Sequence, residues 1–207
     1  WPIRYRDIES WYTYVEKFSG ISGEALGLPQ LPDSEFLPPM EMTFVEKEVR
    51  KRIEKQYPNR NMTIGRVANL SAAKQAQTEQ GRGQCMYRNR CSYGCPFGAY
   101  FSTQSATLPA ASKTGNLTLR PDSIVREIVY DPETQKATGV SVIDSVTSEE
   151  REYFSKIVFV CASTVGSTAI LMNSVSERFP EGLGNDSGEL GHNLMDHHFR
   201  AGARGTW

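Results

Sequence analysis

The stretch that decides the fold is Ile157-Val158-Phe159-Val160-Cys161-Ala162-Ser163. Its five consecutive apolar residues, 157–161, predict a strand that is buried on both faces of a parallel sheet. Two small residues follow, and the apolar positions of residues 164–173 then predict a helix. A buried strand, a small-residue turn and a helix let a nucleotide approach the carboxyl end of a sheet, although plain scaffold uses the same geometry.

Upstream of this stretch, short strands and turns predict a β-meander. Residues 123–130 carry apolar side chains typical of a strand, and Asp131-Pro132-Glu133 is typical of a turn. Residues 138–144 and 151–155 predict two further short strands. The fold class is therefore α/β with α+β character: a meander, a buried strand and helices.

Two amphipathic helices are predicted in the first 60 residues. Residues 7–19 place apolar side chains on one face, and Gly20 provides a C-terminal stop. Thr43 and Glu46 form a capping-box pattern at the start of the second helix. Apolar residues at helical spacing continue this helix, and Pro58 ends it.

Residues 59–114 lack clear periodicity, which is abnormal for so long a stretch inside a compact domain. Their content of Cys, Tyr and Phe argues against disorder. We therefore expect this stretch to wrap around a body supplied by other parts of the chain.

Composition excludes several classes of function. The chain has 207 residues and a formal net charge of −1, so it carries no electrostatic footprint for nucleic acid. Arginines gather at Arg82, Arg88 and Arg90, and a solvated surface is the expected place for them. No apolar run approaches the roughly 20 residues that span a bilayer. A soluble protein is expected, and a cytoplasmic and a periplasmic location both remain open.

Four segments of the chain form an ordered series of motifs. They are Trp1-Pro2-Ile3-Arg4-Tyr5; Cys91-Ser92-Tyr93-Gly94-Cys95-Pro96-Phe97-Gly98-Ala99; residues 116–128 with 159–167; and Gly188-Glu189-Leu190-Gly191-His192-Asn193-Leu194-Met195-Asp196-His197. In this order they resemble the glucose–methanol–choline (GMC) family of FAD oxidoreductases, particularly its bacterial sugar and polyol dehydrogenase branch. Ser167-Thr168 departs from the Ser-Pro of the second family signature, and the Ser-Gly-x-Gly ending is absent after Asn173.

The resemblance implies a partial FAD-binding, Rossmann-like domain with a β-meander, plus part of a substrate or cap region. It assigns residues 1–113 to the substrate side and the wrapping loop, residues 114–187 to the FAD-binding domain, and residues 188–207 to a return to the substrate domain. It also implies three cofactor-binding residues: Val125, whose main chain meets the adenine, and Ala162 and Ser163, beside the adenosine. An ordinary meander position and plain helix–strand packing are the alternatives for these residues.

The implied reaction is hydride transfer from the CH–OH group of a sugar, polyol or glycoside to the flavin of FAD. A dehydrogenase is favoured over an oxidase, with a small-molecule sugar or alcohol as substrate and an electron-acceptor partner. No G-x-G-x-x-G occurs, and the family's catalytic His is expected beyond residue 207. We therefore expect an internal piece of a larger enzyme, with no catalytic residue of its own and weak FAD binding when isolated.

Three clustered cysteines, Cys85, Cys91 and Cys95, suggest an alternative function. Some sugar dehydrogenases of the branch hold an iron–sulfur cluster in the corresponding loop, with an additional Cys after the first, where this chain has Met86. A disulfide or buried thiols are therefore favoured over a cluster, and no metal ligands are assigned. A cysteine-cluster redox or binding protein remains the second class of function, and a non-catalytic binding module the third.

Three histidines near the C-terminus raise the possibility of a zinc site. His192, His197 and His198 flank Asp196, but no distant thiolate partner is evident. The resemblance implies instead that this segment is structural.

Overall fold

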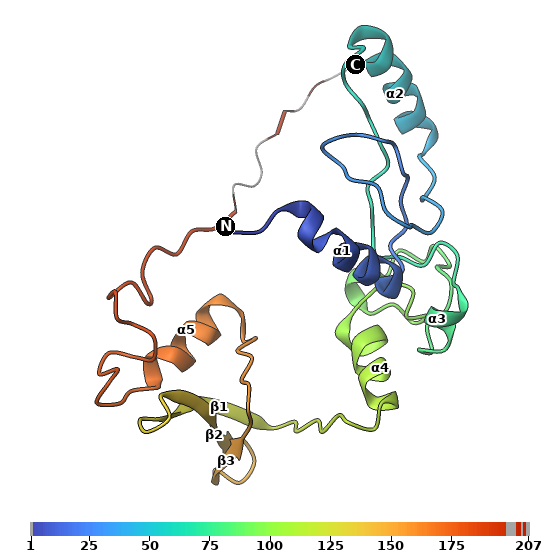
Figure 1. Ribbon diagram of the computed structural model, residues 1–207. Coiled ribbons are helices and arrows are strands. Elements are labelled where there is room, and N and C mark those ends of the chain that lie inside the picture. The colour runs from blue at the N-terminus through green and yellow to red at the C-terminus, as the bar shows by residue number, and fades with distance from the viewer. Residues whose placement is uncertain (1, 198–201, 204, 206–207) are drawn as a thin grey trace. The chain divides into compact units, whose positions relative to one another are not determined.

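The computed structural model describes residues 2–197, 202, 203 and 205, and it divides into two compact units, Trp1–Thr118 and Leu119–Trp207 (Figure 1). Each unit is described by itself. The fold is a mixture of helices with a three-stranded antiparallel sheet, which agrees with the expected partial Rossmann-like class. Within the described residues, no helix is long and apolar enough to cross a membrane.

The sheet of the second unit is the predicted β-meander. Its strands are β1 (Ser123–Asp131), β2 (Lys136–Asp144) and β3 (Glu150–Phe154), paired antiparallel in the order β1-β2-β3. The predicted turn follows β1, where the Asp131 carboxylate accepts hydrogen bonds from the Glu133 amide (3.0 Å) and the Thr134 hydroxyl (2.6 Å).

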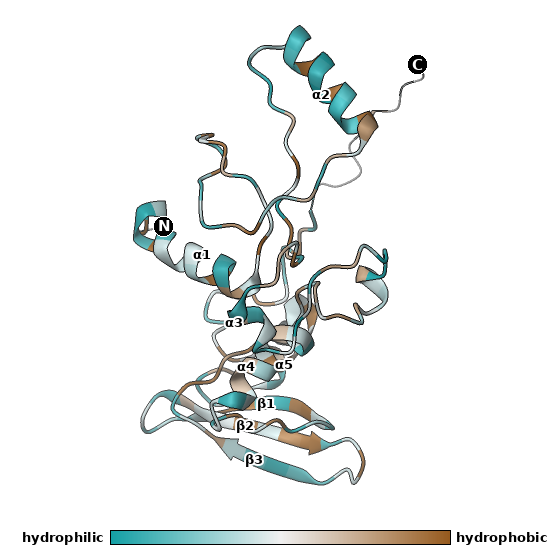
Figure 2. Cartoon of the chain, turned by 90° about the vertical axis from the view of Figure 1, so that its right-hand side faces the viewer, coloured by the Kyte–Doolittle hydropathy of each residue, from teal (hydrophilic) through white to brown (hydrophobic). Residues whose placement is uncertain are grey.

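One face of this sheet forms the small core of the second unit. Ile128 of β1 and Val142 of β2 are buried, whereas β3 is mainly hydrophilic (Figure 2). Gly139 of β2 lies opposite Phe154, and its backbone is in close contact with β3. The alternation of apolar and polar residues therefore sets which face of the meander packs.

Helix α5 (Ser163–Asn173) confirms the predicted helix and packs against β1. The strand predicted at residues 157–161 is wrong: these residues are extended but pair with no strand in the described part of the chain. Ile157 is 68% exposed and Phe159 is 81% exposed. The physical reason is that a strand requires hydrogen-bonding neighbours on its edges, and an apolar run does not supply them.

The first unit contains both predicted amphipathic helices. Helix α1 (Tyr5–Ser19) ends at Gly20, whose φ of 73° is left-handed, as a glycine C-terminal stop requires. Helix α2 (Phe44–Gln56) begins with both hydrogen bonds of the predicted capping box, between Thr43 and Glu46.

The stretch at 59–114 packs against residues 17–37 of its own unit. It contains α3 (Gln75–Thr78), the 3₁₀ turn η1 (Cys91–Tyr93), the π-helical turn η2 (Thr103–Thr107) and α4 (Leu108–Lys113). Leu70 and Ala99 of this stretch form a core cluster with Leu37, and the Gln77 side-chain amide donates to the Lys17 carbonyl at 2.8 Å.

Arg82 corrects the expectation of a solvated arginine group. Arg88 and Arg90 are exposed, but Arg82 is only 2% exposed. Its guanidinium donates to the carbonyls of Gly98 (2.9 Å), Ser19 (2.9 Å) and Ala99 (3.3 Å). Because arginine carries five donors in a rigid fork, it can join three separate backbone carbonyls.

Candidate cofactor site

An apolar slot of about 240 Å³ lies in the second unit, between the meander and the segment that leads into α5. Its walls come from β1, β2, the extended segment and α5. The lining residues are Val125, Ile128, Val140, Val158, Phe159, Val160, Cys161, Ala162 and Ile170. Every side chain in this set is apolar or weakly polar, so the slot suits a flat, uncharged ring system.

The β1 wall is fixed to the end of α5 by one buried serine. The Ile128 amide donates to the Ser174 hydroxyl at 2.8 Å, and that hydroxyl donates to the Ile170 carbonyl at 2.6 Å. A register shift after Val125 interrupts the pairing of β1 with β2 next to this contact. The serine therefore holds the two main walls of the slot, β1 and α5, at a set separation.

We expect Ser174→Ala to lower the free energy of unfolding of this unit by about 1–3 kcal/mol, because it leaves the buried Ile128 amide without an acceptor. Urea denaturation followed by circular dichroism measures the change. Ser145→Ala is the matched control, since Ser145 is exposed and its expected effect is below about 0.5 kcal/mol. Equal stability of the two variants would contradict the role given to Ser174.

The opposite wall ends in the small-residue turn. Ala162 is the N-cap of α5, and its methyl side chain accepts no hydrogen bond from the amides of the first turn of α5. Ser163 has a φ of 62°, which is uncommon for a residue other than glycine. Backbone donors at this end of the slot are therefore free of a capping side chain and can serve a ligand's acceptors.

The structure brings together two of the three residues predicted to bind a cofactor. Val125 and Ala162 both line the slot, and Ser163 begins α5 directly after Ala162 without lining the slot itself. Among the lining residues that the sequence did not individually assign to a cofactor are Ile128, Val140 and Ile170. The alternation of apolar and polar residues along β1 and β2 could have indicated Ile128 and Val140, because it distinguishes the face that packs from the face exposed to solvent.

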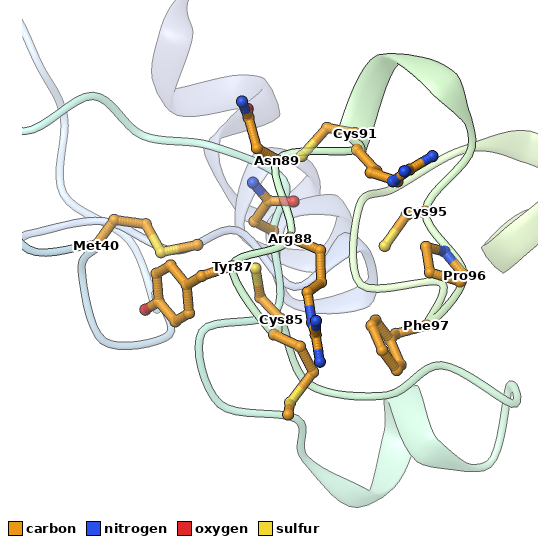
Figure 3. A pocket seen from close by; sticks show the side chains of 12 residues that line it. Met40, Cys85, Tyr87, Arg88, Asn89, Cys91, Cys95, Pro96 and Phe97 are labelled. Atoms are coloured by element: carbon orange, nitrogen blue, oxygen red, sulfur yellow. The ribbon is translucent and has the colours of Figure 1, made fainter.

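The cysteine loop of the first unit contains free thiols. Cys85, Cys91 and Cys95 are partly buried, form no disulfide and line a cavity of about 330 Å³ (Figure 3). Within the part of the chain that the structure describes, no group of three or more His, Cys, Asp or Glu side chains is arranged to hold a metal ion.

The histidine segment borders a different cavity. His192 lines a space of about 590 Å³ between α5 and residues 191–195, and His197 is exposed. His198 and Trp1, which the sequence arguments also used, lie outside the described residues.

Comparison with known proteins shows the family to which the chain belongs. The family model described as GMC oxidoreductase matches residues 3–199. The chain belongs to the GMC oxidoreductase family.

Two curated relatives agree with this assignment. The chain is 28% identical over 212 residues to 2-methyl-1,2-propanediol dehydrogenase of Mycolicibacterium austroafricanum, an alignment that covers 97% of this chain and 35% of that protein. It is 25% identical over 127 residues to the fructose dehydrogenase large subunit of Gluconobacter japonicus, covering 60% of this chain and 22% of that protein. The chain thus spans about a third of the length of the first relative and about a fifth of the second.

The residues around the slot fit the adenosine part of FAD. The slot is apolar, as an adenine ring requires, and β1 is an edge strand, so alternate backbone groups of β1 point away from β2. Such groups match the donors and acceptors on the edge of an adenine. Ala162 lines this space and carries only a methyl group.

Proposed function

We propose that the protein to which this chain belongs is a FAD-dependent dehydrogenase that oxidises the CH–OH group of a sugar, a polyol or a glycoside. The observation that carries the proposal is the family match over residues 3–199, together with an apolar slot lined by Val125 and Ala162. The names of the two relatives support a dehydrogenase, and they support a small diol or a sugar as the class of substrate.

In this proposal, residues 114–187 hold the adenosine part of FAD. The main chain of Val125 meets the edge of the adenine, Ala162 permits its close approach, and Ser163 with the first turn of α5 supplies backbone donors. FAD, when bound, supplies a hydride acceptor for the alcohol carbon. Residues 1–113 and 188–207 belong to the substrate side, and none of them is assigned as the base that removes the hydroxyl proton.

We expect Ala162→Trp to weaken FAD binding at least about tenfold, because the indole occupies the slot. Ala162 is exposed, so the substitution leaves the packing of the meander intact. The measurement is the ratio of flavin to protein after gel filtration of the full-length gene product. Val146→Trp is the control, since Val146 is 76% exposed in the β2–β3 turn and does not line the slot. Equal flavin content in both variants would contradict the assignment of the slot, with Val125 and Ala162, as the cofactor site.

The activity is tested with the full-length gene product. Sugars and polyols should bleach its flavin absorbance and reduce an artificial dye, with little formation of hydrogen peroxide in air. Rapid peroxide formation would indicate an oxidase instead. A colourless protein that cannot be reconstituted with FAD would refute the proposal.

The cysteine-cluster alternative is not supported. The family match and both relatives point to an alcohol oxidoreductase, and the described cysteines offer no arrangement of ligands for a metal.

A further inference from the structure

The register of the meander gives Val125 and Ile128 the same orientation, although they lie three residues apart in β1. Val125 lies opposite Val142 of β2. Ile128 lies opposite Val140, which is two residues from Val142, so the two partners share a face of β2 and an orientation of the main chain. The pairing shifts by one residue directly after Val125, which makes Arg126 the extra residue of a β-bulge. The side chains of Val125 and Ile128 therefore line the slot together.

The same register turns the main chain of Val125 away from β2. In antiparallel strands, residues that bond to the partner strand alternate with residues that do not. The Ile128 amide donates to the Ser174 hydroxyl, at 2.8 Å, and not to β2. The Asp144 amide at the end of β2 donates to the Glu149 carbonyl (2.9 Å), so alternate residues of β2 from 144 to 140 direct their main chain to β3. Val125 and Ile128 therefore direct their amide and carbonyl groups to the outer edge of β1, the edge that faces away from β2.

Ser174 fixes this outer edge of β1 to α5. Ser174 is 4% exposed, and its hydroxyl accepts a hydrogen bond from the Ile128 amide and donates one to the Ile170 carbonyl at 2.6 Å. A bulge disrupts the ladder of hydrogen bonds locally, so β2 alone holds this part of β1 less firmly than it would hold a regular strand. Ser174 does not line the slot, so it can act on a ligand only through the positions of β1 and α5.

The main chain of one residue at such an edge presents one donor and one acceptor side by side. The edge of an adenine carries the complementary pair, because its N1 accepts a hydrogen bond and its 6-amino group donates one. A hypoxanthine carries the reverse pair, since its N1 bears a proton and a carbonyl oxygen replaces the amino group. A base that is held in place by its ribose can make both bonds to Val125 only if it is an adenine and only if β1 stands at the right distance.

We propose that Ser174 is a positioning residue that holds the main chain of Val125 where it selects adenine as the base of the cofactor. This inference rests on the proposed function, in which the main chain of Val125 meets the adenine of FAD. Ser174 contacts no part of the cofactor. Its hydroxyl sets the position of β1 relative to α5, whose N-cap Ala162 forms the opposite wall of the slot.

The test compares FAD with deamino-FAD, in which hypoxanthine replaces adenine, on the full-length gene product after its flavin has been removed. Titration followed by flavin fluorescence measures both dissociation constants. The unaltered protein should bind FAD at least about tenfold more tightly than deamino-FAD, because the analogue leaves buried polar groups without partners. Equal affinities would overturn this inference and leave the dehydrogenase proposal standing. Binding of neither dinucleotide would refute the proposed function and this inference with it.

Two variants distinguish positioning from a general loss of stability. Ser174→Ala should weaken FAD about tenfold and deamino-FAD less than about threefold, so that the preference for adenine nearly disappears. Gly139→Ala is the matched control, because it disturbs the pairing of β2 with β3 in the same unit and does not line the slot. It should keep the preference within about twofold of the unaltered protein, even where both affinities fall. If Ser174→Ala weakens both dinucleotides by the same factor, Ser174 only supports folding and the proposal is overturned.

Discussion

Replacing Arg82 by Met is expected to lower the free energy of unfolding of the first unit by about 4 kcal/mol or more. The guanidinium makes three hydrogen bonds to carbonyls of Ser19, Gly98 and Ala99, and it thereby joins the end of α1 to the adjacent residues Gly98 and Ala99. Methionine fills a similar volume but leaves the carbonyls of Ser19 and Gly98 without the donor that the guanidinium supplies, while the Ala99 carbonyl keeps only the Leu70 amide. Since domains are stable by only about 5–15 kcal/mol, this loss is a large share of the total.

Urea unfolding followed by far-ultraviolet circular dichroism measures this effect. Arg88→Met is the control, because Arg88 is exposed, and its effect should remain below about 0.5 kcal/mol. Arg82→Lys should recover only part of the loss, since the three donors of an ammonium lie on one nitrogen and cannot span carbonyls that the wider guanidinium reaches. Full stability of Arg82→Met would show that water replaces the guanidinium at these carbonyls.

Gly139→Ala is expected to destabilise the second unit by about 3 kcal/mol, through a clash between two backbones. A Cβ atom at this position would lie 2.2 Å from the Tyr153 carbonyl oxygen and 3.0 Å from the Phe154 Cα. Both atoms belong to the backbone of β3, so the clash cannot be relieved by rotating a side chain. The pairing of β2 with β3 must open or shift instead.

Urea unfolding, followed by circular dichroism at the wavelength of the β-sheet signal, measures this loss of stability. Gly65→Ala is the control, because a Cβ there meets nothing within 4 Å and its backbone φ is not left-handed. It should change stability by less than about 0.5 kcal/mol. If the two alanine variants are equally stable, β3 is not held as closely to β2 as the structure indicates.

Much of the secondary structure could be predicted because its signals are local. The capping box of Thr43 and Glu46, the stop at Gly20 and the turn at Asp131 each lie within a few residues of the elements that they limit. The meander could also be predicted, since apolar alternation and turn residues mark each strand separately. All of these features appear within a residue or two of their expected positions.

The features that could not be predicted depend on distant partners. The apolar residues 157–161 indicate a preference for burial, but strand pairing needs a neighbour that the described residues do not offer. The charge of Arg82 predicts a place in solvent, yet its acceptors at Ser19 and Ala99 lie 63 and 17 residues away. No local pattern in the sequence marks those carbonyls as available.

The candidate slot combines residues that could be named from the sequence with a contact between distant residues that could not. Val125 and Ala162 could be named from the resemblance to the GMC family, and the structure places both at one slot. The contact of Ser174 with Ile128 joins positions 46 residues apart through a single hydroxyl, and nothing in the sequence around Ser174 marks it. The binding of FAD by these residues stays a prediction.

The extended segment at residues 157–161 has a practical consequence for anyone producing this chain. An apolar run rich in β-branched residues, without proline and paired with no strand among the described residues, is a template for pairing between molecules and hence for aggregation. Lys156 places one positive charge at its N-terminal end, where such charges restrain self-association. Solubility of the recombinant polypeptide should therefore depend on concentration and decline when Lys156 is replaced by an uncharged residue.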